Sequence, residues 1–230
     1  MVRPSTSTET IRKMGKSGEL RNGSTMVAES RQICVAPNMS DQLYLSLWLN
    51  GFTEHNMLRH YEKLLKLFPV SKLAQSPSLF SVIALQYSEP PVFEHAYAPP
   101  VNMDEVLAAA RELGSADSCF RLETFWDLWQ YDDDWKLLPA RVALCCFGPG
   151  FENDLGDNLH VDLGVEFGID THFLPQPDLP DNYRMTQSNI KSLLKLVHDA
   201  DNRLNVSRRQ LWTESGENFA EKLQAELSSR

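Results

Sequence analysis

Alternating apolar and polar positions predict the first strand of the chain, and a helix follows it. In residues 42–50, leucine occupies every second position and aromatic residues occur between the leucines, which is typical of a strand covered on both faces. Gly51 ends this run. From Thr53, which can cap a helix, apolar residues recur three and four positions apart until Pro69 stops the pattern. The sequence therefore predicts a central strand followed by an amphipathic helix.

The same two periodicities predict the remaining elements. Paired prolines separate a second strand from a short third one, because proline cannot continue the hydrogen-bonding ladder of a sheet. A second helix begins at Asn102, has Glu105 three residues later as in a capping box, and ends at Gly114. The other predicted strands are 79–87, 92–97, 119–130, 137–147 and 159–168, and helices are predicted around 190–204 and 217–227, with a short segment at 206–212 between them.

The order of these elements indicates the fold class. Through residue 130 it is strand, helix, strand, strand, helix, strand, the order of a split βαβ, ferredoxin-like fold. We predict one α+β domain over 39–230, with a ferredoxin-like core, an extended and mainly antiparallel sheet, and helices packed largely on one face. Because this fold carries many unrelated activities, it does not give the function.

Residues 1–38 differ from the rest of the chain. They are rich in Ser, Thr, Gly and charge and show no sustained apolar period, which predicts a disordered N-terminal extension. They also lack the apolar segment of an ordinary secretory signal. An alternative is that Met39 is the natural start and that the preceding residues are not part of the natural protein.

Charge is distributed unevenly between these two parts. The chain has 22 Lys and Arg against 31 Asp and Glu, a net charge of -9. The extension is basic, so 39–230 holds 16 basic and 28 acidic side chains and carries -12. An acidic body repels nucleic acid and suits a basic protein partner. No stretch of the sequence has the run of about 20 apolar residues that a membrane-spanning helix requires.

The four cysteines indicate neither a disulfide framework nor a metal site. Cys145 and Cys146 are adjacent in a predicted strand and so point to opposite faces, which prevents them from bridging. No Cys or His spacing resembles a zinc motif. Reduced thiols are therefore expected, which favours a cytoplasmic protein.

The polar face of the sixth predicted strand is the leading candidate for a catalytic site. His160, Asp162 and Glu166 occupy alternate positions there, and Asp154 and Asp157 lie in the loop just before. Histidine with carboxylates can bind a divalent cation or transfer a proton, as in a small hydrolase or metal-dependent enzyme. No bounded metal motif is present.

A structural interpretation of the same carboxylates competes with this one. Arg121 and Glu123 lie on the fourth predicted strand and Arg141 lies on the fifth. Opposite charges on neighbouring strands can pair across a sheet face. In that case the polar face is a ladder of ion pairs.

Aromatic residues are densest near the end of the fourth predicted strand. Alternation sends Trp126 to one side and Phe125, Trp129 and Tyr131 to the other, and Trp135 follows. One side must belong to the core, whereas the other is either covered by the C-terminal helices or exposed as an interface.

Two functions therefore remain open. The sequence contains no nucleophile elbow and no Cys–His pair, which favours a non-enzymatic cytoplasmic interaction or ligand-binding protein with an acidic surface and a basic partner. The alternative is the hydrolase or metal-dependent enzyme described above. No cofactor is indicated. The residues expected to contact a ligand or partner are Trp129, Tyr131, Trp135, Arg121 and Arg141.

Overall fold

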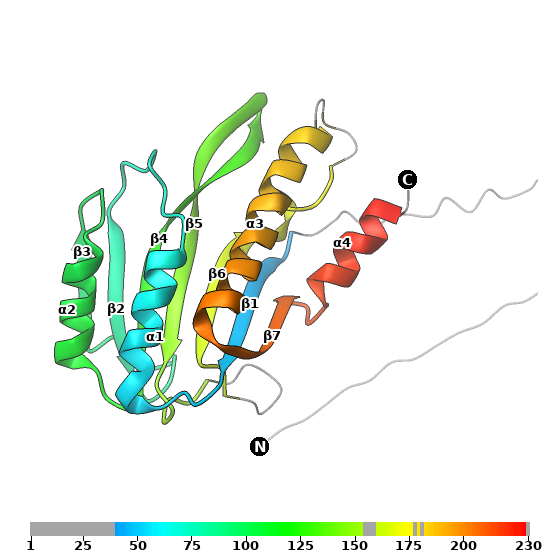
Figure 1. The fold of residues 1–230 in the computed structure, drawn as a ribbon. Coiled ribbons are helices and arrows are strands. Elements are labelled where there is room, and N and C mark those ends of the chain that lie inside the picture. The colour runs from blue at the N-terminus through cyan, green and yellow to red at the C-terminus, as the bar shows by residue number, and fades with distance from the viewer. Residues whose placement is uncertain (1–39, 154–159, 177–178, 180–181, 229–230) are drawn as a thin grey trace, which may run out of the picture. The chain divides into compact units, whose positions relative to one another are not determined.

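The computed structural model describes residues 40–153, 160–176, 179 and 182–228. Within these residues the chain forms an open, antiparallel sheet of seven strands together with four α-helices (Figure 1). The strands lie in the order β3-β2-β4-β5-β6-β1-β7. The elements are β1 (Gln42–Leu49), α1 (Glu54–Leu67), β2 (Ser78–Ala84), β3 (Phe93–Tyr97), α2 (Met103–Leu113), β4 (Ser118–Asp132), β5 (Asp134–Phe147), β6 (Leu163–Ile169), the short 3-10 helix η1 (Asp170–His172), α3 (Asn182–Leu204), β7 (Val206–Thr213) and α4 (Phe219–Ser228). The predicted extension 1–38 and the predicted site residues Asp154 and Asp157 lie outside the described residues.

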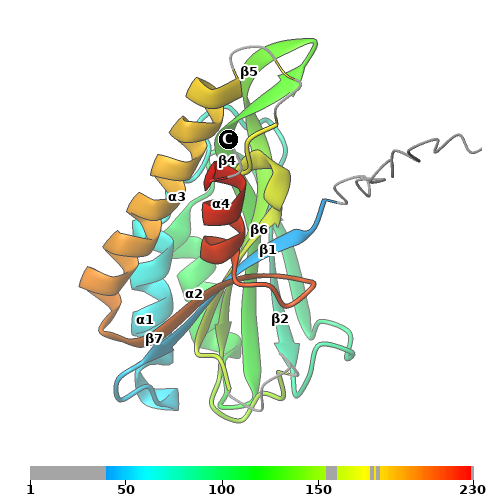
Figure 2. The ribbon, with the colours of Figure 1, turned by 90° about the vertical axis from the view of Figure 1, so that its right-hand side faces the viewer.

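Helices α1, α2 and α3 lie on one face of the sheet (Figures 1 and 2). Every second residue of β1, starting at Leu43, points into the core between these helices and the sheet and is buried. The amphipathic pattern of α1 buries Met57, Tyr61, Leu64 and Leu65 against the same core, as its apolar spacing predicts. The opposite face of the sheet carries no helix (Figure 2). That uncovered face is where the candidate site lies.

The ferredoxin-like core that the element order predicts is not confirmed. The direction of the strands does not decide this, because neighbouring strands are antiparallel in a split βαβ sheet and in this one; the strand order does, because a split βαβ sheet has its first strand between the third and the fourth. β1 pairs with β6 and β7, and β5 and β6 separate it from β4. The long β4–β5 hairpin fills the centre of the sheet because both of its strands gain further partners, β2 on one side and β6 on the other. The structure thus shows an α+β protein with a larger sheet than predicted.

Two elements differ from their predicted bounds for identifiable reasons. β6 begins at Leu163, four residues later than predicted, because the Asp162 side chain, in place of a strand backbone, accepts the Leu49 N–H. The segment at 206–212 is a full strand, β7. Its residues from Ser207 to Gln210 are all polar, so periodicity gives no strand signal there.

Candidate functional site: a groove across the open sheet face

The strand register places seven residues of the uncovered face in one row that crosses the strands. Directly paired residues of antiparallel strands point to the same face, so the printed pairs can be followed from β3 to β7. We call this set the central row. Its members are Glu94, Ser81, Arg121, Cys145, Gly164, Ser46 and Gln210.

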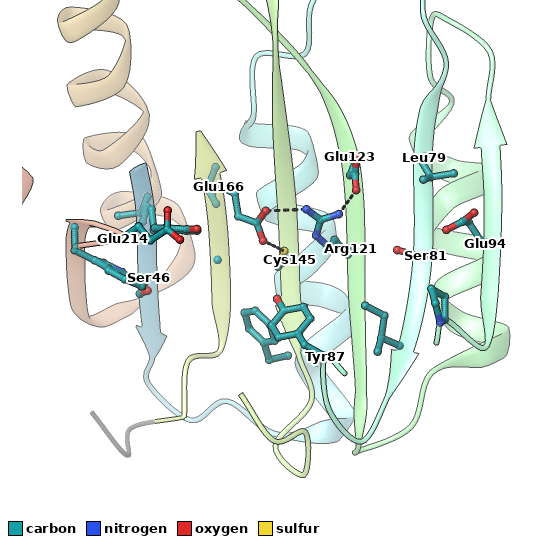
Figure 3. A pocket seen from close by; sticks show the side chains of 18 residues that line it. Ser46, Leu79, Ser81, Tyr87, Glu94, Arg121, Glu123, Cys145, Glu166 and Glu214 are labelled. Carbon is teal, nitrogen blue, oxygen red and sulfur yellow. Dashed lines mark hydrogen bonds and ion pairs between the residues drawn. The ribbon is translucent and has the colours of Figure 1, made fainter. Parts of the chain in front are cut away.

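Small residues in the central row form the floor of a groove. Ser81, Cys145, Gly164 and Ser46 have small side chains, whereas bulkier residues lie on both sides of the row. The resulting cavity, which we call the open-face groove, has a volume of about 630 Å³ (Figure 3). Its larger apolar and aromatic side chains are those of Tyr44, Leu79, Ile83, Tyr87, Pro91, Phe147 and Trp212.

Arg121 rises from the central row and lies between Glu123 of its own strand, β4, and Glu166 of β6, on the far side of β5 (Figure 3). Its Nη2 donates to Glu166 Oε2 at 2.7 Å and its Nη1 donates to Glu123. Arg141 Nη1 lies 3.7 Å from the second oxygen of Glu123. Burial alone would lower the pKa of Arg121, but its hydrogen bond to Glu166 and the charges of Glu166 and Glu123 outweigh burial and raise it. The ion-pair ladder considered from the sequence is therefore present.

The two thiols at this face, those of Cys119 and Cys145, are buried. Cys145 is 1% exposed, and its Sγ donates to Glu166 Oε1 at 3.7 Å. Burial, and after it the charge of Glu166, raises the pKa of Cys145 well above its ordinary value. Burial also raises the pKa of Cys119 to about 12. Because the thiolate is the reactive form, neither residue is suited to covalent chemistry. As predicted, Cys146 points the other way, into the main core.

The ends of the groove carry unneutralised negative charge. Glu94 on β3 and Glu214 just after β7 lie at opposite ends of the groove (Figure 3). Both are exposed, and within the described residues neither has an ion-pair partner. The lining as a whole contains four glutamates and one arginine, a net charge of -3. The groove therefore favours cationic ligands.

Two buried serines on the floor have hydrogen-bonding capacity to spare. Ser81 is 5% exposed, lines the groove, and has no hydrogen-bond partner for its hydroxyl in the part of the chain that the structure describes. Ser46 is 4% exposed and its Oγ accepts from Trp212 Nε1 at 3.0 Å, which leaves its own O–H proton available. Trp212 also stacks on Tyr44, with ring centroids 4.7 Å apart. Both hydroxyls can therefore donate a hydrogen bond to a polar group of a ligand on the floor.

The structure does not bring the three predicted catalytic residues together in one site. Glu166 faces the groove and pairs with Arg121. Asp162 precedes β6, is 9% exposed, and its Oδ2 accepts the Leu49 N–H at 2.7 Å, so this carboxylate is committed to the backbone of β1. Burial raises the pKa of Asp162, and His160, which also precedes β6, acts in the opposite direction. Among the described residues, no three His, Cys, Asp or Glu side chains are grouped so that they could hold a metal ion.

The predicted aromatic contacts lie elsewhere, on the β4–β5 hairpin. Trp126 is buried in the main core, as one side of the strand must be. Tyr131 is 37% exposed and its ring meets that of Trp135 at 5.5 Å near the hairpin turn. Trp129 is half-buried, and its backbone is held by Asn189 of α3. Of the predicted contact residues, only Arg121 lines the open-face groove, while Arg141 is exposed beside it.

Sequence reasoning missed the residues that make the groove. Ser46 and Tyr44 are visible as the polar and aromatic positions of the first strand, and Ser81 as a polar position of the second. Their common row depends on which strands pair and in what register, and neither can be read from local periodicity.

Comparison with protein-family models, with curated proteins and with solved structures found no match to this chain. None of the helices in the described ranges combines the length and apolarity needed to cross a membrane.

Proposed function

We propose that this protein is a non-enzymatic binding protein and that its open-face groove takes a basic segment of a partner protein. The observation that carries the proposal is the groove itself, a cavity of about 630 Å³ with a glutamate at each end that has no ion-pair partner among the described residues and, on its floor, Ser81, whose hydroxyl has no hydrogen-bond partner there. Lysine or arginine side chains of a partner complement Glu94 and Glu214.

Apolar contacts and charge have different roles in this proposal. The stacked rings of Tyr44 and Trp212 at the β7 side, and the ring of Tyr87 beside Phe147 of β5, offer flat apolar surface to a ligand. Exposed ion pairs contribute only about 0.2–1 kcal/mol each, so Glu94 and Glu214 give selectivity and faster association more than affinity. The proposal therefore expects moderate affinity that weakens with salt.

The enzymatic alternative has less support. One oxygen of Asp162 already accepts the buried Leu49 N–H, and among the described residues no third His, Cys, Asp or Glu side chain joins His160 and Asp162 in a group that could hold a metal ion. The thiols nearest the groove are held protonated by burial. Glu166 is engaged by Arg121. Binding of a ligand in the groove, by contrast, requires neither a reactive thiol nor a metal ion.

The test is a binding measurement with peptide probes of opposite charge. Fluorescein-labelled peptides of four Arg-Pro-Ser or four Glu-Pro-Ser repeats are titrated with the purified full chain at low and high salt, and fluorescence anisotropy is recorded. We expect the arginine peptide to bind, more weakly at high salt, and the glutamate peptide not to bind. Absence of binding by basic peptides of any arrangement would overturn the proposal.

Matched variants locate the binding site. In the double variant Glu94→Gln and Glu214→Gln, we expect the Kd of the arginine peptide to rise about three- to tenfold, because two exposed charge pairs are lost. The control double variant is Glu54→Gln and Glu112→Gln, which removes the same charge from α1 and α2 on the other face of the sheet. Equal weakening by both double variants would show that only net charge matters and would contradict a site in the groove.

A further inference from the structure

We infer that the segment bound by the open-face groove is a polyproline II helix that crosses the strands, with Arg or Lys at every third position. The inference rests on the proposed function and deepens it, because it names the conformation and the sequence pattern of the ligand. It is carried by the direction of the groove, the floor hydroxyls, the aromatic walls and the spacing of the carboxylates.

The direction of the groove excludes the addition of the ligand to the sheet as an extra strand. Strand addition requires the free backbone of an edge strand, and the edges of this sheet are β3 and β7. The groove instead crosses the face of the sheet from Glu94 on β3 to Trp212 on β7. A ligand in the groove contacts side chains, and its backbone cannot form hydrogen bonds with the backbone of a strand.

The floor hydroxyls favour a ligand with free backbone carbonyls over an α-helical one. Ser81 and Ser46 are buried, line the groove, and each can donate a hydrogen bond to a ligand. The backbone groups of an α-helix are bonded within the helix, whereas those of a polyproline II helix are free. Four strand spacings separate β2 from β1, about 19 Å, and six residues of polyproline II span about 19 Å. Carbonyls two turns apart can therefore reach both serines.

The carboxylates of the groove recur on every second strand. Glu94 lies on β3, Glu123 on β4 and Glu166 on β6, and Glu214 follows β7. Two strand spacings are about 10 Å, and the offset along the strands lengthens the outer steps to about 12 Å. Three residues of polyproline II advance about 9 Å and return to the same side of the helix. Arg121 engages one oxygen of Glu123 and one of Glu166, so a ligand cation at these two would meet the second oxygen, whereas Glu94 and Glu214 have no ion-pair partner among the described residues. Long arginine side chains cover the remaining difference in spacing.

Aromatic rings complete the match to a proline-containing ligand. Tyr44 stacks on Trp212 toward one end of the groove, and Tyr87, whose ring lies 5.8 Å from that of Phe147 on β5, contributes a ring near the middle. Proline-rich segments bind in grooves lined by aromatic residues, because their preformed conformation loses little entropy on binding. From β3 to β7 the groove spans six strand spacings, about 29 Å, which corresponds to about nine residues of polyproline II.

The test compares basic peptides of identical composition or identical charge spacing. The full chain is titrated with labelled peptides of four Arg-Pro-Ser repeats, of the same residues with all arginines adjacent, and of four Arg-Gly-Ser repeats. We expect the first peptide to bind at least about fivefold more tightly than the other two, because only it has both the spacing and the preformed conformation. Equal binding of all three would overturn this inference and leave the proposed function intact. If no basic peptide binds, both fail.

A serine variant tests the contact with the ligand backbone. Ser81→Ala removes one floor hydroxyl, and we expect it to weaken binding of the Arg-Pro-Ser peptide about threefold to tenfold. Ser192→Ala on α3 is the matched control and should leave the Kd unchanged, because that hydroxyl lies on another element and bonds to Ser188 O. If Ser81→Ala leaves the Kd of the peptide unchanged, the assigned floor contact is contradicted. A thermal melt of each variant checks that both are folded.

Discussion

Arg121 on β4 and Glu166 on β6 are joined by a 2.7 Å hydrogen bond that passes over the intervening strand β5. The contact is possible because β5 presents small side chains, Ala143 and Cys145, beneath the guanidinium. It holds the middle of the open-face groove in one arrangement, while the glutamates at its ends remain free of ion pairs within the described residues.

Removal of the central cation should destabilise the fold. In Arg121→Met, Glu123 and Glu166 lose their common partner while they remain partly buried, so we expect the free energy of unfolding to fall by about 1–2 kcal/mol. Urea denaturation measures the change. The control Arg141→Met removes a side chain that is 75% exposed and should cost less than about 0.5 kcal/mol. Equal effects of the two substitutions would contradict a special role for Arg121.

Substitutions of Asp162 test whether this carboxylate stabilises the fold or belongs to a catalytic site. Asp162→Ala leaves the Leu49 N–H without an acceptor, which should cost about 1–3 kcal/mol of stability. Asp162→Asn retains an acceptor oxygen and should lose clearly less. Thermal unfolding of both variants, together with calorimetric titration with divalent cations, checks this. Unchanged stability with loss of a cation-binding signal would favour the enzymatic alternative instead.

A buried histidine should make the protein less stable in mild acid. Burial, and after it the charges of Lys63 and Arg59, lowers the pKa of His60 below its ordinary value of 6.5. The unfolded chain therefore binds a proton before the folded chain does, so stability is lost as the pH falls from 6.5 toward the lower pKa of the folded state. Burial acts on His172 in the same direction.

The variant His60→Phe tests this pH dependence. Phe52 lies against His60, with ring centroids 5.9 Å apart, so a phenyl ring suits the site. Between about pH 7 and about pH 5, we expect the free energy of unfolding of the variant to fall less than that of the natural chain. A curve with the same slope for both proteins would show that His60 does not contribute.

One asparagine holds the projecting β4–β5 hairpin to α3. The side chain of Asn189 is 2% exposed, accepts from Trp129 N at 2.9 Å, and donates to the carbonyl oxygens of Trp129 at 2.9 Å and His172 at 2.8 Å. Asn189→Ala should therefore cost about 1–3 kcal/mol and speed hydrogen exchange at the Trp129 amide. Asn202→Ala, at an exposed position of the same helix, is the control. Unaltered exchange at Trp129 would contradict the account.

Local features of the fold were predictable from the sequence, because they depend on near neighbours. Gly51 follows β1 with a positive φ of 69°, and Asn102 caps α2 by accepting from the Asp104 N–H. The opposite directions of Cys145 and Cys146 follow from strand geometry alone. The pairing of Glu166 with Arg121 agrees with the ion-pair ladder, one of the two interpretations that the sequence offers for the polar face of the sixth predicted strand.

Long-range features were not predictable, because they depend on which strands meet. The order of the sheet places β1 between β6 and β7, far in sequence from both, and nothing in its own residues indicates this. The groove floor exists only once Ser46 and Ser81 fall in one row. The alternating pattern wrongly includes Asp162 in the sixth strand. Its position alternates as in a strand, but its side-chain oxygen, in place of a backbone carbonyl, accepts the Leu49 N–H.

Amide chemical shifts of the isotopically labelled full chain, titrated with the Arg-Pro-Ser peptide, test the central claim most directly. A ligand in the open-face groove should change the shifts of central-row residues such as Ser81, Gly164 and Ser46 more than those of α1, α2 and α3. Changes confined to the helical face or to the β4–β5 hairpin, or no changes at saturating peptide, would contradict the assignment of the groove as the binding site.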